Sequence, residues 1–218
     1  MIDFASRRLI RRVILTAAAL VVWFYTQSLL GARPAPASGI TDGLHQLTAS
    51  LNAYFFAHTA AANALLIVSS AFIDLFALFL LLRWLFGDSV RPFLGLFLLM
   101  ILRQILQALC ALPTPPQMIW HYPGFPSLLV TYSVAGDFFF SGHTAIAVFA
   151  AMEIARLQKR WLTAVAILLV LFEVATVIVL RAHYTMDVFT GLLAALWIAP
   201  IAVRISAPID RFLNNRGK

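Results

Sequence analysis

Charged residues are scarce in this chain of 218 residues, and cysteine is almost absent. Charged side chains make up 11% of the sequence and hydrophobic ones 62%, and the mean hydropathy is +0.90. An ordinary soluble domain has about 25% charged residues, so this class of protein is excluded. Cys110 is the single cysteine, so no disulfide can form within the chain.

Long apolar runs occupy most of the sequence instead. Since a membrane-spanning helix needs about 20 residues, a chain of this length has room for about six spans. We predict an all-α polytopic membrane protein, folded as a single transmembrane domain over 1–218. The six expected spans are about 13–30, 61–82, 93–112, 138–155, 161–180 and 184–203.

Positive charge is unevenly distributed between the two ends of these spans. The net charge of +7 would suggest nucleic-acid binding in a soluble protein. Of the 16 Lys and Arg residues, however, all but Arg33, Arg103 and Arg181 fall on one side, and the loop 113–134 has none. By the positive-inside rule this pattern places both termini in the cytoplasm. No nucleic acid is expected as a partner.

Two segments within the first 60 residues can each be interpreted in two ways. Four arginines, an apolar run and Ala35-Pro36-Ala37 resemble a signal peptide with its cleavage site. The run is long for such a peptide, so we favour a retained first span. Further on, apolar residues from Leu44 to Phe55 recur at helical spacing. They predict either a helix on the outer surface beside the site or a continuation into the second span.

Two histidine motifs dominate the second half of the chain. One reads Gly-Asp-Phe-Phe-Phe-Ser-Gly-His-Thr over 136–144, and the other reads Arg-Ala-His-Tyr-Thr-Met-Asp over 181–187. His183 follows His143 by 40 residues, which is about the length needed to cross a bilayer, turn and return. We therefore predict a helical hairpin that brings both histidines to the non-cytoplasmic face.

The residues around each histidine suit chemistry on a phosphate. Asp187 lies four residues after His183, so on a helix its carboxylate can accept a hydrogen bond from the imidazole. Ser141 and Gly142 open the helix that carries His143. The unpaired N–H groups and positive dipole of a helix start favour an anion.

Together these motifs resemble those of the sphingomyelin synthase group within the type 2 phosphatidic acid phosphatase superfamily. The quoted residues are Ser141-Gly142-His143-Thr144 and His183-Tyr184-Thr185-Met186-Asp187. The plant phosphatidylcholine:diacylglycerol cholinephosphotransferases are similar, including an arginine at the position of Arg181. The loop Leu112-Pro113-Thr114-Pro115, after the helix that carries Arg103, adds to the likeness, which covers about residues 80–190.

The resemblance implies a catalytic core at about 93–203 and a role for each site residue. His183, oriented by Asp187, would attack phosphorus and become phosphohistidine, while His143 would act as acid and then base. Arg181 and the N–H groups near Gly142 would offset the charge of the transferred group. Asp137 matches an acidic position of the motif and would either orient a site residue or cap the helix. The resemblance implies metal-free chemistry and no cofactor.

The sequence departs from the lipid phosphatases of the same superfamily. They have Lys-x6-Arg-Pro and Ser-Arg-x5-His, whereas here Trp84 precedes Arg91-Pro92 and Val177 lies six residues before His183. Fewer cations suit a phosphodiester, which carries one negative charge. We predict transfer of phosphocholine or phosphoethanolamine to diacylglycerol or ceramide, with a lipid phosphatase or phospholipase C-like hydrolase as the alternative.

Aromatic residues near the motifs would suit a cationic head group through cation-π contact. They also fit the aromatic belt of any membrane protein. The residues concerned are Phe138, Phe139, Phe140, Tyr184 and Trp120.

Two charged residues lie inside expected spans, where each costs a few kcal/mol unless paired or hydrated. Arg103 and Glu173 are each about nine residues, or roughly 13 Å, from the outer ends of their spans. One expectation is that they pair or line one polar cavity below the histidines. The alternative is that they face different partners, of which Asp74 is one candidate.

Two further functional classes remain open on sequence grounds. His143, His183 and Asp187 are suitable types of metal ligand, and a lipid transporter would not need them for catalysis. The expected location is the bacterial inner membrane, with the active site facing the periplasm and membrane lipids as donor and acceptor.

Overall fold

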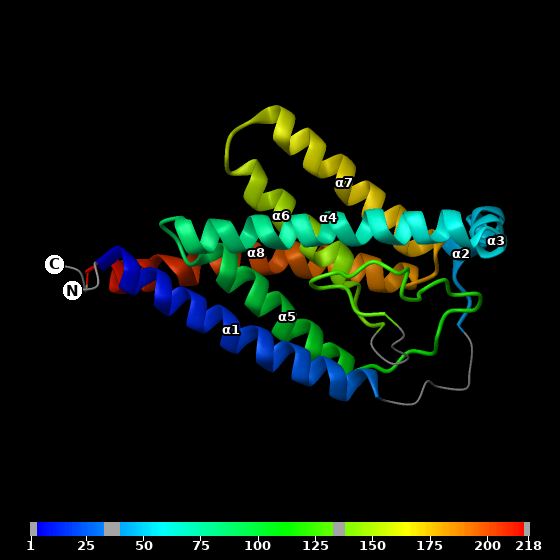
Figure 1. The fold of residues 1–218 in the computed structure, drawn as a ribbon, viewed down its shortest axis with the longest axis horizontal. Coiled ribbons are helices and arrows are strands. Elements are labelled where there is room, and N and C mark those ends of the chain that lie inside the picture. Colours follow the sequence, from blue (N-terminus) through cyan, green and yellow to red (C-terminus); the bar gives the residue numbers. More distant parts are fainter. Residues whose placement is uncertain (1–3, 33–39, 133–137, 216–218) are drawn as a thin grey trace.

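The computed structural model describes residues 4–32, 40–132 and 138–215. In these residues the regular elements are eight α-helices, with no strand, which confirms the all-α prediction. Figure 1 shows them arranged as an elongated bundle. Their bounds are α1 Phe4–Gly31, α2 Gly43–Leu47, α3 Ala49–Ala57, α4 Thr59–Phe86, α5 Arg91–Leu109, α6 Gly142–Ala155, α7 Arg160–Val179 and α8 Thr185–Asn215.

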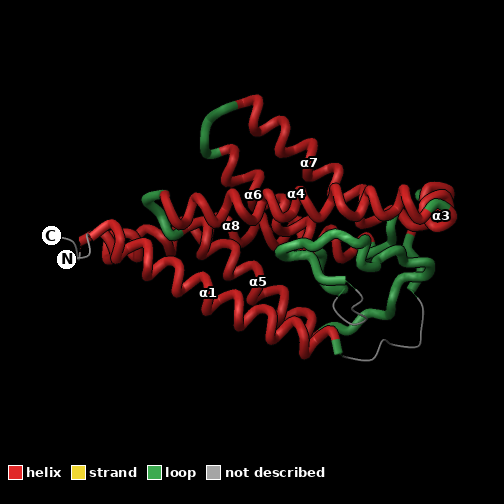
Figure 2. The backbone as a smooth tube through the Cα atoms, viewed as in Figure 1, coloured by secondary structure: helices red, strands yellow, loops and turns green. Residues whose placement is uncertain are grey.

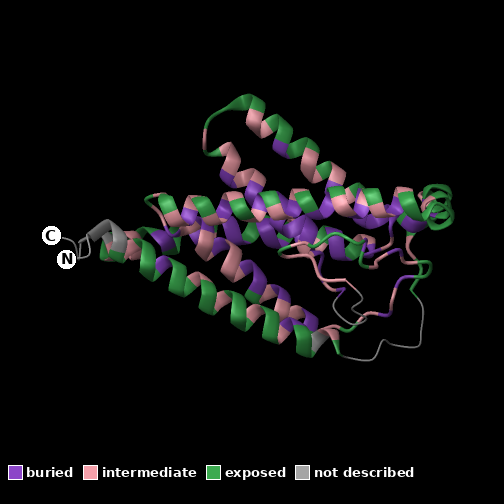
Figure 3. Ribbon diagram, in the orientation of Figure 1, coloured by how far each residue is buried: buried purple, intermediate pink, exposed green. Residues whose placement is uncertain are grey.

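The centre of the bundle is formed by α4, α5, α6 and α8. Their facing sides contribute buried apolar residues such as Phe76, Leu99, Phe149 and Ile198. Because lipid tails are as apolar as these side chains, close van der Waals packing rather than removal from water holds such helices together. In Figure 3 the buried residues concentrate on these helices, whereas α1 is mostly exposed along the outside. Many large apolar side chains of α1, between Leu9 and Leu29, therefore face the surroundings of the bundle.

Five helices in the described residues are long and apolar enough to cross a membrane: α1, α4, α5, α7 and α8. The expected fourth span is shorter than predicted, because α6 begins at Gly142 and not at Phe138. Its 14 residues rise about 21 Å, less than the roughly 30 Å of a hydrocarbon core. Five of the six expected spans are thus confirmed as helices long enough to cross a membrane, and the one at α6 is not confirmed. Helix α8 continues beyond Val203 to Asn215. The chain is an integral membrane protein.

Helix α1 begins, and helix α8 ends, at the same end of the bundle (Figure 1). We call this end the basic end. There Arg12, only 4% exposed, donates from its guanidinium to the carbonyls of Trp84, Leu85 and Gly87. These are among the last carbonyls of α4, which have no partner within the helix. Basic residues of α1 therefore serve as a cap for α4, in addition to any role in topology.

The apolar stripe that begins at Leu44 lies on the surface at the opposite end. It forms α2 and α3, which are separated from α4 at His58. Leu47 is 78% exposed and Leu51 is 52% exposed. Of the two interpretations given above, the surface helix is confirmed and the continuation into the second span is wrong. Residues Ala35 to Ala37 lie outside the described residues.

The long connection between α5 and α6 folds into the bundle (Figure 2). Asp74, near the midpoint of α4, accepts hydrogen bonds from Ser127 Oγ and from the N–H groups of Leu128 and Leu129. A carboxylate inside an apolar helix is costly unless it is hydrogen-bonded. Asp74 therefore fixes a loop segment at the depth of the middle of α4, where it helps to enclose the site.

Candidate active site

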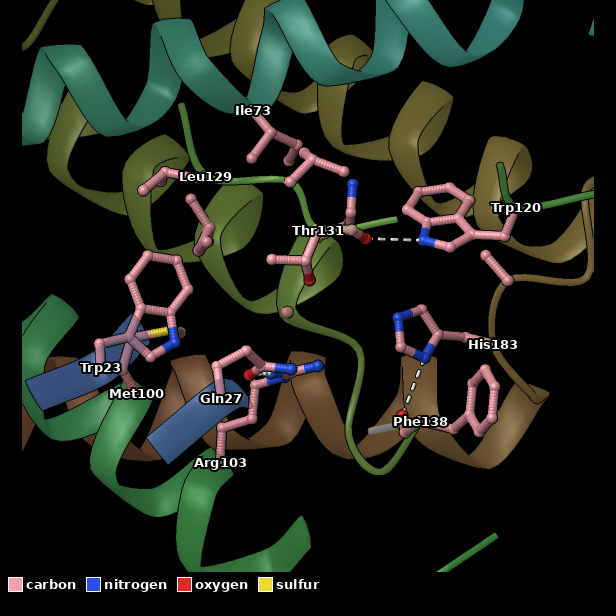
Figure 4. A pocket seen from close by; sticks show the side chains of 15 residues that line it. Trp23, Gln27, Ile73, Met100, Arg103, Trp120, Leu129, Thr131, Phe138 and His183 are labelled. Atoms are coloured by element: carbon pink, nitrogen blue, oxygen red, sulfur yellow. Dashed lines mark hydrogen bonds between the residues drawn. The ribbon is translucent and has the colours of Figure 1, made fainter. Parts of the chain in front are cut away.

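His143 and His183 line one pocket, together with Arg103 and Trp120. His143 is the second residue of α6, and His183 follows the end of α7. Figure 4 shows His183 and Trp120 on one side of this pocket and Arg103 with Gln27 on another. The predicted hairpin therefore does bring the two imidazoles to one place. We call this space, of about 50 Å³, the histidine pocket.

The histidine pocket extends into the middle of the bundle. Ile73 and Met100, which also line it, are near the midpoints of α4 and α5. The shortness of α6 is the reason, since the helix that carries His143 begins well inside the bundle. The location of both histidines at the non-cytoplasmic surface stays a prediction, and the pocket that they line extends to the middle of the bundle.

The His183 ring is held in one tautomer by the backbone. Its Nδ1 lies 2.8 Å from the carbonyl oxygen of Phe138, drawn as a dashed line in Figure 4. Because a carbonyl oxygen accepts only, Nδ1 carries the proton and donates it to this bond. The lone pair is then on Nε2, the nitrogen that is free to attack an electrophile.

Asp187 holds His183 less directly than predicted. Its Oδ2 is 3.7 Å from His183 Nδ1, which is too long for a hydrogen bond. The same oxygen accepts from the N–H of Tyr184 at 2.9 Å, so the carboxylate closes the first turn of α8 in the manner of a capping box. Phe138 thus takes the orienting hydrogen bond, and Asp187 adds a nearby negative charge.

The start of α6 is built as an N-cap. Ser141 Oγ accepts from the N–H of Thr144 at 3.3 Å and from its hydroxyl at 3.1 Å. The Ser141 N–H donates to the carbonyl of Asp187 at 3.0 Å, which ties the two histidine motifs together. A Cβ on Gly191 of α8 would lie 2.6 Å from the Ser141 carbonyl, so this close approach requires glycine.

Gly142 makes room for the guanidinium of Arg103. A Cβ at this position would lie 3.2 Å from Arg103 Nε. Arg103 is 7% exposed, and it donates to the Phe140 carbonyl at 3.0 Å and to Gln27 Oε1 at 3.0 Å. Since α1, α5 and the start of α6 all contribute to this arrangement, a positive charge is fixed beside the helix start that carries His143.

The His143 ring is buried against Trp120. The two ring centroids are 5.2 Å apart and the planes meet at 82°, an edge-to-face contact. Trp120 is itself fixed by a hydrogen bond from its indole to the Thr131 carbonyl at 3.0 Å. Nε2 of His143 is buried without a hydrogen-bond partner. A buried imidazole nitrogen without a partner, in a pocket with a second histidine, is typical of a group that meets a substrate.

Other predicted site residues lie away from the histidine pocket. Arg181 donates to the Pro116 carbonyl, to Gln117 Oε1 and to the His45 carbonyl. The Tyr184 hydroxyl donates to the Pro113 carbonyl at 3.1 Å. Neither side chain lines the pocket, so in this structure both hold the loop after α5. Asp137 lies outside the described residues.

Arg103 and Glu173 do not pair. Glu173 accepts from Ser69 Oγ at 2.7 Å, its Oε1 has no partner, and it does not line the histidine pocket. Asp74 binds the loop described above. The expected ion pair or shared cavity is therefore wrong, and the alternative of separate partners is confirmed. Sequence depth placed both residues at one level but gave no information on which way each side chain points.

Arg91 lies far from the histidines, as its position in the sequence predicted. It pairs with the buried carboxylate of Glu153, with Nε 2.9 Å from Oε1, and Arg156 contributes a second contact at 3.0 Å. Arg91 is 12 residues before Arg103 on α5, or about 18 Å along the helix. The arginine of the phosphatase-like Arg-Pro dipeptide thus stabilises the basic end of the bundle.

Residues outside the two histidine motifs also position the site. His45 of α2, 5% exposed, donates from Nε2 to the His183 carbonyl at 2.9 Å. Asp42 accepts from the N–H and hydroxyl of Thr185, both at 2.6 Å, and from the N–H of His45 at 3.1 Å. An Asp before a helix is a recognisable N-cap signal. The sequence has no local signal for the contact of His45 with His183.

The hydrogen bonds of the Asp42 carboxylate should make the stability of the fold depend on pH. Burial alone would raise the pKa of its carboxyl, but hydrogen bonds from Thr185 and the His45 N–H lower it below the ordinary value. A lowered folded-state pKa stabilises the fold fully above the unfolded-state pKa of about 3.9, and this contribution is lost as the pH falls toward the folded-state pKa. Asp42→Asn should remove this dependence.

The expected size of the Asp42→Asn effect follows from the loss of a helix cap. An amide has one acceptor oxygen, so at least one hydrogen bond is lost, at a cost of about 1 kcal/mol. The melting temperature near neutral pH should fall by about 2–4 °C. Thermal unfolding in detergent at neutral and acidic pH measures both effects, with the exposed Asp88→Asn as control. An unchanged acid dependence in Asp42→Asn would contradict the assignment.

No group of three or more His, Cys, Asp or Glu side chains in the described residues is arranged to hold a metal ion. The alternative of a metal bound by His143, His183 and Asp187 therefore has no geometric support in this part of the chain. Nδ1 of His183 is also committed to the Phe138 carbonyl.

The model of the AtPDCT1/2 family matches residues 41–204, well over half of the chain. The chain belongs to the AtPDCT1/2 family. This confirms the resemblance to the plant cholinephosphotransferase group that the two histidine motifs indicate. The AtPDCT1/2 match includes both motifs, Arg103 and Asp42, whereas Trp23 and Gln27 of the pocket precede it.

The chain is similar in sequence to phosphatidylcholine:diacylglycerol cholinephosphotransferase 1 of Arabidopsis thaliana. It is 25% identical over 178 residues, which cover 82% of this chain and 56% of the relative. The chain thus spans little more than half the length of this curated relative. No solved structure matches the chain.

Proposed function

We propose that this membrane protein transfers a phosphorylated head group between lipids through a phosphohistidine intermediate. The donor is a glycerophospholipid, the group is phosphocholine or phosphoethanolamine, and the acceptor is diacylglycerol or ceramide. The observation that carries this proposal is the histidine pocket, which two imidazoles and the Arg103 guanidinium line together. The name of the Arabidopsis relative, phosphatidylcholine:diacylglycerol cholinephosphotransferase 1, supports the same reaction class.

His183 is the proposed nucleophile. With Nδ1–H bound to the Phe138 carbonyl, its Nε2 lone pair attacks the donor phosphorus. An N–P bond forms, and the P–O bond to the glycerolipid breaks. The electron pair of that bond goes to the leaving alkoxide, which takes a proton from His143 and departs as diacylglycerol. The covalent step divides one difficult displacement into two easier ones.

In the second half of the reaction His143 is the proposed base. It takes the hydroxyl proton of the acceptor lipid, whose oxygen attacks the phosphorus. The new P–O bond forms as the N–P bond breaks, which returns His183 to its starting state. One histidine can act as acid and then as base because each half-reaction reverses its protonation. The Arg103 guanidinium and the α6 start at Gly142 offset the charge on the phosphoryl oxygens.

A phosphodiester suits the charge of the histidine pocket better than a phosphomonoester. Among its described lining residues Arg103 is the single Lys or Arg, and Arg181 and Arg91 do not line it. A phosphodiester carries one negative charge and a monoester up to two. Trp120 and Phe138, which also line the pocket, add an aromatic surface for a cationic head group. This charge count favours transfer over the action of a lipid phosphatase.

The proposed catalytic core remains at about 93–203, within a single domain, with Trp23, Gln27 and Ile73 closing the pocket from outside this range. The proposed orientation places the basic end in the cytoplasm, following the positive-inside rule. Both termini are then cytoplasmic, and the pocket opens toward the periplasm of a bacterial inner membrane.

A labelled-lipid assay tests the proposed function. The purified protein receives phosphatidylcholine or phosphatidylethanolamine labelled in the head group, with or without diacylglycerol or ceramide of a distinguishable chain length. Transfer predicts a new labelled lipid that depends on the acceptor, and a covalent intermediate predicts ping-pong kinetics. A water-soluble labelled product would assign the protein as a hydrolase instead. Absence of any turnover, with lipid movement across vesicles, would favour a transporter.

A further inference from the structure

A second and larger cavity lies between α1, α4 and α5. Its volume is about 410 Å³, and its lining is almost wholly apolar. Side chains of α1 form one wall, the facing sides of α4 and α5 form the others, and the loop at Leu128 closes one end. We call this space the apolar cavity. The histidine chemistry described above does not use it.

The apolar cavity adjoins the histidine pocket. Four residues line both spaces: Trp23, Met100, Leu129 and Ile146. In Figure 4 the three of these that are labelled lie together on the side of the histidine pocket away from His183. A molecule with its polar part beside the histidines and an apolar part beyond Trp23 would therefore occupy both spaces.

The few polar atoms at the far end of the apolar cavity are already satisfied. The Trp84 indole donates to Thr16 Oγ1 at 3.0 Å, and the Thr16 hydroxyl donates to the Arg12 carbonyl at 2.9 Å. A polar ligand would lose its bonds to water there without gaining new ones. A hydrocarbon chain from the surrounding lipid loses no hydrogen bonds there, and it exchanges contacts with lipid tails for contacts with apolar side chains.

The apolar cavity is also accessible from the side of the bundle. Leu20 is 38% exposed, and Phe24 and Leu78 are each 41% exposed, although all three line the cavity. These residues belong to α1 and α4, and α1 is a candidate membrane span. An opening between these two helices would face the lipid that surrounds the protein. A lipid chain could enter through it without crossing water.

We propose that the apolar cavity binds an acyl chain of the lipid whose phosphoryl group reacts in the histidine pocket. This inference rests on the proposed function for the identity of the polar end, and on the cavity itself for the apolar end. Ile73 of α4 lies beside the histidine pocket, and Trp84 of the same helix lies at the far end of the apolar cavity. The two residues are 11 positions apart, which is about 16 Å along the helix. The acyl chain lies along α4 toward the basic end, with α1 as its outer cover.

Photocrosslinking tests occupancy without requiring turnover. The full-length protein in nanodiscs is exposed to phosphatidylcholine that carries a photoreactive group partway along one acyl chain, and labelled peptides are mapped. The label should fall on inward-facing residues of α1, α4 and α5, such as Leu96 and Leu81. Excess unlabelled phosphatidylcholine should compete. Label restricted to outward-facing residues such as Leu171 of α7, 59% exposed, would overturn the proposal.

Cavity-filling substitutions test whether the bound chain belongs to the reacting lipid. Ala77 and Ala19 line the cavity, whereas Ala71 and Ala18 on the same helices are exposed. Ala77→Trp and Ala19→Trp should raise the KM for long-chain phosphatidylcholine about tenfold or more. The KM for dioctanoyl phosphatidylcholine should change less, because its short acyl chains occupy less of the cavity. Ala71→Trp and Ala18→Trp introduce the same side chain outside the cavity and should stay within about twofold of wild type.

The two sets of results separate this inference from the proposed function. If no lipid is turned over but crosslinking maps to the apolar cavity and is lost in Ala77→Trp, the proposed function fails and chain binding stands. If transfer occurs but Ala77→Trp and Ala71→Trp, both folded by thermal unfolding, have the same KM for every chain length, the acyl-chain proposal fails. Crosslinking unchanged by Ala77→Trp would overturn it as well.

Discussion

Replacing His183 with glutamine is expected to reduce head-group transfer at least about 1000-fold, as removal of a catalytic nucleophile does in other enzymes. Glutamine keeps a similar size and a polar end, but it has no lone pair that can attack phosphorus. The variant should also fail to form a covalent intermediate. Incubation with head-group-labelled donor, without acceptor, should label wild-type protein with an acid-labile phosphoramidate and leave His183→Gln unlabelled.

His58→Gln is the matched control for this experiment. His58 is exposed at the start of α4, and its ring bonds the Tyr54 carbonyl, so the same chemical change is made far from the histidine pocket. Its transfer rate should stay within about twofold of wild type. Labelled His183→Gln protein, or a His183→Gln variant with normal turnover and a normal melting temperature, would exclude His183 as the nucleophile.

Replacing Arg103 with methionine is expected to lower kcat for transfer about 100-fold, the usual loss when one group that stabilises transition-state charge is removed. Methionine keeps much of the length and the apolar stem while removing the positive charge beside Gly142. The effect should appear in kcat more than in KM, because phosphoryl charge shifts most in the transition state. Arg103→Lys should recover part of the rate, since it restores charge without the planar geometry of the guanidinium.

Arg83→Met serves as the control for loss of an arginine from a long apolar helix. Arg83 is in the last turns of α4, at the basic end and outside both cavities. Its transfer rate should change by less than about threefold. Thermal unfolding of Arg103→Met separates a catalytic loss from misfolding, because Arg103 also bonds the Phe140 carbonyl and Gln27. A folded Arg103→Met protein with wild-type kcat would contradict the proposed role.

Several features of the protein follow from the sequence because they depend on local chemistry and on the length of a helix. Apolar runs between basic loops predict helices in a membrane, and the spacing of 40 residues between His143 and His183 predicts their return to one place. Ser141 before Gly142 predicts the N-cap that the structure contains. Each of these depends on neighbours along the chain or on a rise per residue that hardly varies.

Other predictions failed where direction mattered more than distance along the chain. A spacing of four residues on a helix favoured a hydrogen bond between His183 and Asp187, but His183 precedes α8, so its ring turns to the Phe138 carbonyl. Arg103 and Glu173 lie at similar depth in their helices yet face different neighbours. Depth is a property of sequence position, whereas the facing of a side chain is set by how the helices rotate against one another.

The sequence by itself determined the membrane class, the helical hairpin and the pair of histidines that the AtPDCT1/2 family match includes. Only the tertiary structure decided which partners complete the site: Arg103 beside Gly142, Trp120 against His143, and His45 and Asp42 behind His183. These contacts join residues up to 143 positions apart. No local pattern encodes them, because they arise when separate helices pack together and satisfy buried polar groups from whichever neighbour is within reach.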